Sequence, residues 1–218
     1  MNKIIRTILL IIIIFTFHAC THTETEYHPN GAVKSIITYK GKKEHGLMTY
    51  YRADGVKELE INMVNGKKEG EMTRWFNANN IESKTHYKND LKDGVEILYS
   101  IDGYKIMETS YKEGKKHGYY ATWHNKDQIK EDGAFWNDLF DGQWNYYDQR
   151  GFPVGEANFN KGAGEQIAFD LQGNLMQITT YRDNKKNGKE IEFNPKGDTI
   201  RITIFENDRI IDKQEFQQ

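Results

Sequence analysis

Aromatic residues recur every 24 residues through nearly the whole of this 218-residue chain. One series, with a single step of 22, comprises Tyr27, Tyr51, Trp75, Tyr99, Trp123, Tyr147, Phe169 and Phe193. A second series, with Met63 in one of its places, comprises Tyr39, Tyr87, Tyr111, Phe135, Phe159, Tyr181 and Phe205. Glycines keep the same period at Gly46, Gly70, Gly94, Gly118, Gly142, Gly164 and Gly188. A fixed short period indicates a repeat architecture, in which each unit is buried by its neighbours and the array commonly serves as a binding surface.

The sequence of one repeat, residues 27–50, predicts a β-hairpin. Asn30-Gly31 predicts a two-residue type I′ turn, because both central residues of such a turn need positive φ. Its equivalents include Asn79-Asn80 and Lys126-Asp127, whose side chains tolerate a left-handed backbone. Strands are expected at 32–39 and 47–51, joined by a polar turn that ends at Gly46. No window of helical length shows a 3.6-residue period.

The predicted fold is therefore all-β: an elongated, twisted antiparallel meander of about eight 24-residue β-hairpin repeats. About sixteen strands at a spacing of ~4.8 Å would span roughly 75 Å. The aromatic series would stack as a ladder along one face, replacing the compact core that a 37% hydrophobic composition can hardly supply. The repeat glycines would have a structural role in the turns.

The N-terminus has the pattern of a secretory signal. Lys3 and Arg6 precede an apolar run over residues 8–17, which suits the core of a signal peptide and is too short to span a bilayer. Residues 17–20, Phe-His-Ala-Cys, resemble the bacterial lipobox, although the Phe and His depart from its commonest form. We expect a lipoprotein signal peptide over 1–19, a lipidated Cys20 with a polar tether over 20–26, and one repeat array over 27–218. The alternative is an uncleaved signal anchor with an incidental cysteine.

Lipid on Cys20 would place the protein on a bacterial envelope membrane, facing away from the cytoplasm, with inner and outer membranes both open. Cys20 is the only cysteine, so the chain has no internal disulfide. Without Lys3 and Arg6, 28 basic residues (30 less two) stand against 32 acidic ones, for a net charge of −4. This balance does not indicate a nucleic-acid partner, which requires a clearly basic surface.

Lysine pairs occupy the polar turns and would project along one long edge of the sheet. The candidate contact residues among them are Lys42, Lys43, Lys67, Lys68, Lys115 and Lys116. Such an edge could touch anionic headgroups or an acidic protein. Carboxylates that would largely cancel its charge lie in the same turns, at Glu44, Glu69, Asp93 and Glu113. The alternative is that the lysines only discourage edge-to-edge association.

Three segments carry a family resemblance: residues 39–46, 111–118 and 181–188, each an aromatic residue followed by a lysine pair and a glycine. Together with the period, they resemble the bacterial MORN-variant repeat from residue 27 to about 206. The resemblance implies a β-hairpin repeat fold used for interaction. Many bacterial members of that family are labelled antitoxins of toxin–antitoxin pairs, and eukaryotic relatives are linked to membrane lipids and to assembly scaffolds.

Two units depart from the pattern. The fifth replaces the lysine turn with residues 137–142, which puts Leu139 and Phe140 at a turn as a candidate contact site, unless they fold back over the neighbouring unit. The sixth loses two residues between Phe159 and Phe169 and is rich in glycine. Because glycine weakens strands and permits bulges, a kink is expected there.

No catalytic or metal-binding constellation emerges from the sequence. His45 and His117 occupy the same turn position three units apart, roughly 30 Å, which is too far for one metal ion. Carboxylates that share one repeat position, about 10 Å apart in neighbouring units, read as a solvated strand face: Glu60, Glu108, Asp132 and Glu156. No Gly-x-Ser-x-Gly motif or phosphate-binding glycine loop is present. We expect no enzyme activity, no cofactor and no metal.

The sequence thus predicts a lipid-anchored extracytoplasmic repeat protein that mediates protein–protein interaction, with an antitoxin or immunity protein as its sharper form. The alternative is a membrane-surface or envelope scaffold that contacts anionic lipid through its lysine-rich turns.

Overall fold

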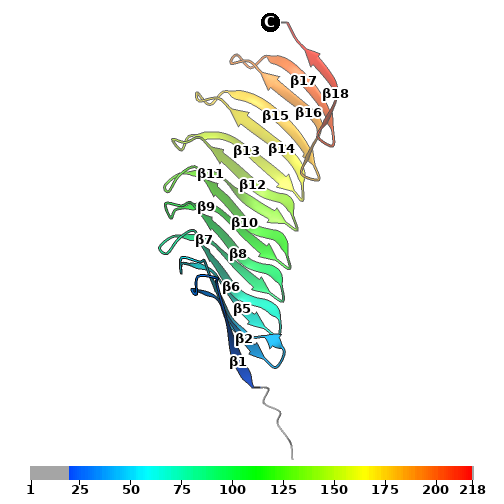
Figure 1. Ribbon diagram of the computed structural model, residues 1–218. Helices are drawn as coiled ribbons and strands as arrows, with labels where there is room; N and C mark the ends of the chain where they lie inside the picture. The colour runs from blue at the N-terminus through cyan, green and yellow to red at the C-terminus, as the bar shows by residue number, and fades with distance from the viewer. Residues whose placement is uncertain (1–19, 218) are drawn as a thin grey trace, which may run out of the picture.

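The computed structural model describes residues 20–217, which form a single open antiparallel sheet (Figure 1). Its strands are β1 Thr21–Tyr27, β2 Val33–Lys40, β3 Lys43–Glu44, β4 Gly46–Tyr51, β5 Lys57–Val64, β6 Lys67–Trp75, β7 Ile81–Lys88, β8 Leu91–Tyr99, β9 Lys105–Lys112, β10 Lys115–Trp123, β11 Ile129–Trp136, β12 Leu139–Tyr147, β13 Pro153–Asn160, β14 Ala163–Phe169, β15 Leu175–Arg182, β16 Lys185–Phe193, β17 Thr199–Glu206 and β18 Arg209–Glu215.

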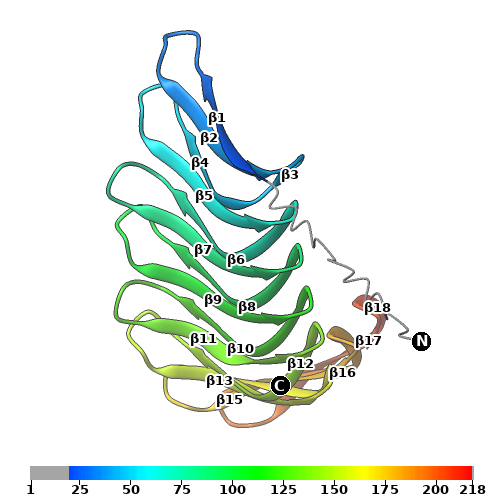
Figure 2. The same ribbon diagram turned by 90° about the horizontal axis from the view of Figure 1, so that it is seen from below.

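The sheet is a meander, as the period predicts. Strands pair with their neighbours in the chain, and β3 and β4 both pair with β2 as two parts of one strand. Within the described residues β1 pairs only with β2, and β18 only with β17, so the sheet has two free ends. Viewed from below, the stack of strands follows a curved and twisted course (Figure 2). Twist of this kind is expected of a wide open sheet.

The array begins before residue 27. Residues 21–27, within the segment expected to be a polar tether, form the edge strand β1 and pair with β2 from Thr21 to Tyr27. Alternating threonines explain this, because β-branched side chains favour strands. The expected signal peptide, residues 1–19, lies outside the described residues.

The type I′ turns lie at the opposite ends of the hairpins from the ends predicted. At Asn30-Gly31 only the glycine has positive φ, and in Asn79-Asn80 neither residue does. These sites are longer loops. His28, for example, accepts a hydrogen bond from the backbone N–H of Gly31 and donates one to the carbonyl of residue 32. Two-residue turns with positive φ at both positions occur instead between the lysine-bearing strand ends, at Asn65-Gly66, Asn89-Asp90, Glu113-Gly114, Asn137-Asp138, Lys161-Gly162, Asp183-Asn184 and Asn207-Asp208.

The repeat glycines lie in strands rather than in turns. In the β5–β6 hairpin, Ile61 pairs with Met72 and Met63 pairs with Lys68, so the second strand holds two extra residues around Gly70. Gly70 has a φ of 84°, which only glycine adopts at little cost. The same two-residue bulge recurs in the β7–β8, β9–β10, β11–β12 and β15–β16 hairpins.

The strand pairing of the sixth unit is regular and lacks the bulge that its glycines would permit. The β13–β14 hairpin shows no register shift, and Gly164 pairs directly with Phe159. The two residues missing from this unit are therefore the bulge itself. A Cβ on Gly164 would collide with the carbonyl of Asn158, so glycine is needed here for close packing and not for a positive φ.

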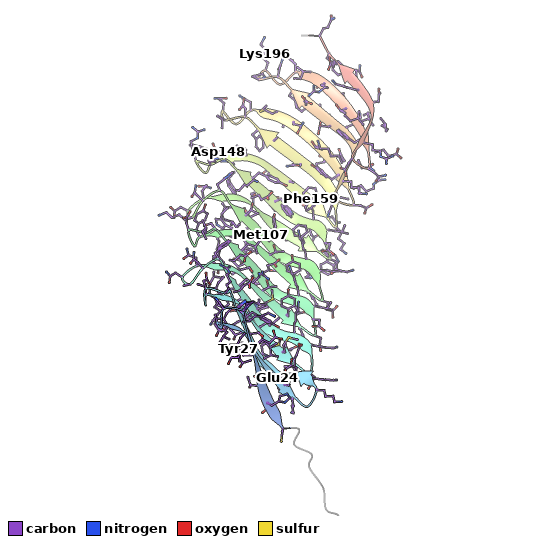
Figure 3. All side chains as sticks on the ribbon, in the orientation of Figure 1. Glu24, Tyr27, Met107, Asp148, Phe159 and Lys196 are labelled. Carbon is purple, nitrogen blue, oxygen red and sulfur yellow. The ribbon has the colours of Figure 1, made fainter. Side chains whose placement is uncertain are left out.

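The two aromatic series occupy opposite faces of the sheet. Tyr146 packs against the cluster that holds Phe159 of the second series, whereas its neighbour Tyr147 belongs to the first series and points to the other side. We call the side that bears Ile61, Phe135, Trp144 and Phe159 the packed face and the other side the outer face. The expected ladder along one face is therefore two separate rows. Residues 20–217 form a single layer of strands, from which side chains project on both sides (Figure 3).

The packed face holds an aromatic cluster in the middle of the array. Phe135, Trp144 and Phe159 are 7%, 2% and 3% exposed, although the sheet is a single layer. Their rings contact one another edge to face, with centroids 5.2 Å apart for the pair Phe135 and Trp144. A smaller cluster of Met48, Ile61 and Met63 lies near the N-terminal end. Between the clusters, buried Thr85, Glu96 and Thr109 share the packed face with Tyr87 and Tyr111, whose rings are covered by lysines.

Candidate functional site

The histidines serve the repeat structure. The Nε2 atoms of His28 and His124 lie 2.8 Å from the carbonyl oxygens of Tyr51 and Tyr147, each in the next unit. No group of three or more His, Cys, Asp or Glu side chains that could hold a metal ion occurs within residues 20–217. Each of these histidines thus links one unit to the next.

The row of carboxylates is bound locally. Glu60 and Glu108 form ion pairs with Lys57 and Lys105 at 2.5 and 2.6 Å, and Asp132 accepts a hydrogen bond from Asn145. The two lysines also lie over the rings of Trp75 and Trp123, so the charged row and the outer aromatic row support each other. Such pairs stabilise a strand face.

A shallow hollow of about 380 Å³ opens beside the end of this row. It is lined by Gln143, Glu156, Asn158, Glu165 and Ile167, on β12 to β14. The two carboxylates in it keep ordinary strand spacing, and no third ligating group joins them in the part of the chain that is described. We assign it no chemistry.

Tyrosines of the packed face keep their protons far above neutral pH. Burial raises the pKa of Tyr120 to about 12, and the nearby carboxylate of Glu131 adds to the effect. Burial likewise raises the pKa of Tyr181 above its ordinary value. These phenols therefore act as neutral packing groups that donate hydrogen bonds, such as the one from Tyr181 to Gln166.

The two lysines of each pair have different surroundings. Alternation along the strand sends the second lysine to the packed face, where its Nζ lies over an aromatic ring of the next unit. The distances to the ring centroid are 4.9 Å for Lys68 over Tyr87 and 4.9 Å for Lys116 over Phe135. Lys92 and Lys186 lie over rings in the same way and also pair with Glu96 and Glu190. Lys68 and Lys116 thus stabilise the sheet and are not free contact groups.

The first lysine of the pairs at 67–68, 115–116 and 185–186, and the second lysine of the pair at 42–43, belong to a basic row on the outer face. We call this row the turn rim: the residues directly before and after each two-residue turn. Its cations are Lys40, Lys43, Lys67, Lys88, Lys112, Lys115, Arg182, Lys185 and Arg209. All are exposed, and none forms an ion pair within residues 20–217. Lys42 lies in the first turn and is also exposed.

Carboxylates of the turns bind backbone N–H groups rather than the rim cations. Asp90 accepts from the N–H of Lys68 at 2.8 Å, and Asp93 accepts from the N–H of Glu113 at 3.1 Å. Glu69 accepts in the same way from Asn89. Each of these bonds joins one turn to the next along the edge. Glu69 and Asp93 thus lie in the turns beside the lysines, as expected, and form no ion pair with them within residues 20–217.

Leu139 and Phe140 follow the fold-back alternative. Phe140 packs into the aromatic cluster, with ring centroids 4.9 Å from Trp144 and 5.2 Å from Phe159. Leu139 is half-buried beside the turn. An exposed Leu-Phe contact site was therefore a wrong expectation, because the missing lysine leaves room on the packed face for the Phe140 ring.

An apolar row on the outer face escaped the sequence analysis. Ile167, Ile178, Ile191 and Ile202 lie directly opposite one another on β14 to β17, and we call them the isoleucine patch. Met176, on β15 with Ile178, is 48% exposed. In the earlier units the positions equivalent to Ile178 and Ile202 bear Glu60, Lys84, Glu108, Asp132 and Glu156. The positions equivalent to Ile167 and Ile191 bear Thr49, Thr73, Ile97, Ala121 and Asn145. Aligning the repeats on the 22-residue step would have revealed that both sets become isoleucine at the C-terminal end.

Cys20 is exposed and directly precedes β1. No helix within residues 20–217 is long and apolar enough to cross a bilayer.

The MORN repeat variant family matches the chain over residues 23–40 and 68–89. Each match covers most of one strand, the longer loop after it and the strand that follows, namely β1–β2 and β6–β7. No curated protein matches the chain. The family resemblance seen in the sequence is thus supported for these two segments: the chain carries MORN repeat variants there.

Proposed function

We propose that this protein is a lipid-anchored scaffold outside the cytoplasm that binds a protein partner through the isoleucine patch. The observation that carries the proposal is an apolar row on an open sheet face, with no layer over it among residues 20–217. The isoleucines are half-buried and Met176 on the same strand as Ile178 is 48% exposed, and a contiguous row of apolar side chains on a sheet face is the kind of patch that marks interaction sites.

Repeat architecture supports a binding role over a catalytic one. A sheet built from interchangeable hairpins presents broad surface and repeats the same contacts, which suits recognition of another macromolecule. The histidines and carboxylates that could serve chemistry are instead bound to backbone carbonyls or to lysines. A non-enzymatic function follows as part of the proposal.

The partner is tested by proximity cross-linking in the native cell. Ile178→Lys and Ile191→Lys should remove the cross-linked partner, because a buried lysine without a counter-ion opposes docking. Glu58→Lys introduces the same side chain on an early strand, away from the patch, and should leave the partner in place. Equal loss in all three variants, or loss in none, would rule out the patch as the docking site.

Anchoring is tested separately. Radiolabelled palmitate should enter the wild-type chain and not Cys20→Ala; equal labelling of both would refute lipid attachment at this residue.

An antitoxin role is the sharper form of the proposal, and it rests on the labels of similar bacterial repeats. Expression of the neighbouring reading frame alone should then harm the cell, and co-expression of this chain should protect it. A neighbour that is harmless alone would remove the antitoxin form and leave the scaffold function untouched.

A further inference from the structure

The turn rim carries a run of positive charge that the fold does not use. Its nine cations include Lys67, Lys115 and Lys185, and all nine are exposed without an ion pair within residues 20–217. Glu206 is the one acidic residue at a rim position in the described turns. By contrast, the packed-face lysines Lys92 and Lys186 both pair with glutamates. The rim charge is therefore available to a ligand.

The shape of the rim favours a linear ligand. Rim positions recur at every turn, about 9.5 Å apart for two strands, and follow one long edge of the sheet. This edge curves and twists with the array (Figures 1 and 2). A flat membrane can meet only part of such a line, whereas a flexible polymer can follow all of it.

Apolar rim residues and hollows between the turns indicate what kind of polymer fits. Trp136 is 42% exposed, with Lys161 over its ring and His117 beside it, and lines a hollow of about 270 Å³ together with Lys112, Lys115 and Glu113. Leu91 is 50% exposed and lines a second hollow of about 450 Å³ with Lys88, Asp93 and Glu113, where Asp93 accepts a hydrogen bond from the backbone N–H of Glu113 and Glu113 lies at the turn. Sugar rings present C–H faces to apolar side chains and carboxylates to lysines, whereas an inorganic polyphosphate offers only charge.

We infer that the turn rim binds a linear acidic polysaccharide. Cations on either side of each turn pair with its carboxylates, and Trp136 and Leu91 contact its ring faces. The inference is independent of the isoleucine patch, because rim and patch come from different residues. Each can fail while the other stands.

The test measures affinity for polygalacturonate, with neutral dextran, polyphosphate and phosphatidylglycerol vesicles as comparison ligands. Residues 20–217 form one continuous sheet, so the chain can be produced from residue 20 with Cys20→Ser. Polygalacturonate should bind at low salt and weaken steeply as salt rises, because neutralised charges release counter-ions. Dextran should not bind. Preference for vesicles over polygalacturonate would reassign the rim to a membrane and overturn the inference.

Two triple variants that lose the same number of charges distinguish binding at the rim from attraction to the net charge of the protein. Lys67→Gln, Lys115→Gln and Lys185→Gln together should weaken polygalacturonate binding at least tenfold. Lys126→Gln, Lys130→Gln and Lys196→Gln together should change polygalacturonate binding less than threefold. These three lysines are exposed and lie at the longer loops, along the edge of the sheet opposite the turn rim. Equal weakening in the two variants would show non-specific attraction and overturn the site.

Trp136→Ala tests the sugar contact. It should weaken polygalacturonate binding several-fold and leave polyphosphate binding unchanged. If both ligands weaken equally, or neither does, the rim recognises charge alone and the assignment to a polysaccharide fails.

Discussion

Adjacent lysines of the same pair have different roles, because successive side chains of a strand point to opposite faces. Lys116 has its Nζ 4.9 Å from the ring centroid of Phe135 and 5.6 Å from that of Tyr120, whereas Lys115 is exposed on the rim. Lys116→Gln should therefore lower the free energy of unfolding by about 0.5–1 kcal/mol, the usual worth of an accessible cation–π contact. Urea unfolding measures it. Lys115→Gln is the matched control, and a loss as large as that of Lys116→Gln would contradict the division.

Glycine is required at position 133 because the indole ring of Trp144 occupies the space beside it on the packed face. A Cβ at this position would overlap the ring of Trp144, which is 2% exposed. Gly133→Ala should thus destabilise the fold by about 1–3 kcal/mol through overpacking, read from urea unfolding. Combining it with Trp144→Leu, which frees the space, should make the added cost of the alanine small. A full cost in the double variant would show that the glycine acts through its backbone instead.

Alkaline pH should weaken the fold through the buried tyrosines. The pKa of Tyr120 is raised to about 12 by burial and by Glu131, above an ordinary value of 10.0. The unfolded chain therefore loses this proton first, so stability is complete below pH 10 and falls as pH rises towards 12. Urea midpoints across that range measure the fall, and Tyr120→Phe should flatten part of it. An unchanged slope in the variant would exclude Tyr120 as a contributor.

The two kinds of connection between strands differ in the backbone they require. Asn89 has a φ of 50° in a two-residue turn, whereas Asn79, in a longer loop, has no positive φ. Asn89→Ala should cost about 1–2 kcal/mol, since a left-handed conformation is unfavourable for alanine, and Asn89→Gly should be nearly neutral. Asn79→Ala should change the unfolding midpoint little. If Asn79→Ala destabilised the fold more than Asn89→Ala, the turn assignment made from the sequence would be correct after all.

Strands could be predicted from the period, but their connections could not. Alternating apolar residues and the recurrence of aromatics gave the hairpins and their order correctly. Asn30-Gly31 misled because the same dipeptide suits a two-residue turn and the end of a longer loop, and only pairing partners distinguish them. The two-residue bulge at Gly70 likewise depends on hydrogen bonds between strands, which leave no local signal in the sequence. The absence of this bulge from the β13–β14 hairpin explains why one step of the period is 22 residues.

At the scale of the molecule, a part of each candidate surface was visible in the sequence. Lysine pairs pointed to a basic edge, yet only the alternation of faces shows that Lys67 lies on the rim and Lys68 does not. The isoleucine patch was hidden because the missing bulge in β13–β14 places Ile167 11 residues after Glu156 where 13 are usual, which moves the whole row out of the 24-residue register. Rim and patch arise from the same repeat, with different side chains at equivalent positions.

Because the units are interchangeable, we predict that one whole repeat can be removed without loss of the fold. Deleting residues 81–104 joins Asn80 to Lys105, which brings β9 beside β6 in place of β7. Lys68, which lies over Tyr87 in the full chain, would then lie over Tyr111, the ring that Lys92 covers now. Glu69 would accept from the N–H of the turn residue that Asp93 binds in the full chain.

The shortened chain should fold, because each unit contacts only its neighbours. Its maximum dimension, measured by small-angle X-ray scattering, should decrease by roughly 10 Å, the width of two strands. Deleting only residues 81–92 removes β7 and the turn after it. β8 would then follow β6 directly and would have to run parallel to it, and the short loop that remains between them could not make that connection. That control should be unfolded by circular dichroism. If the 24-residue deletion unfolds as well, the units are not equivalent and the array folds as one indivisible domain.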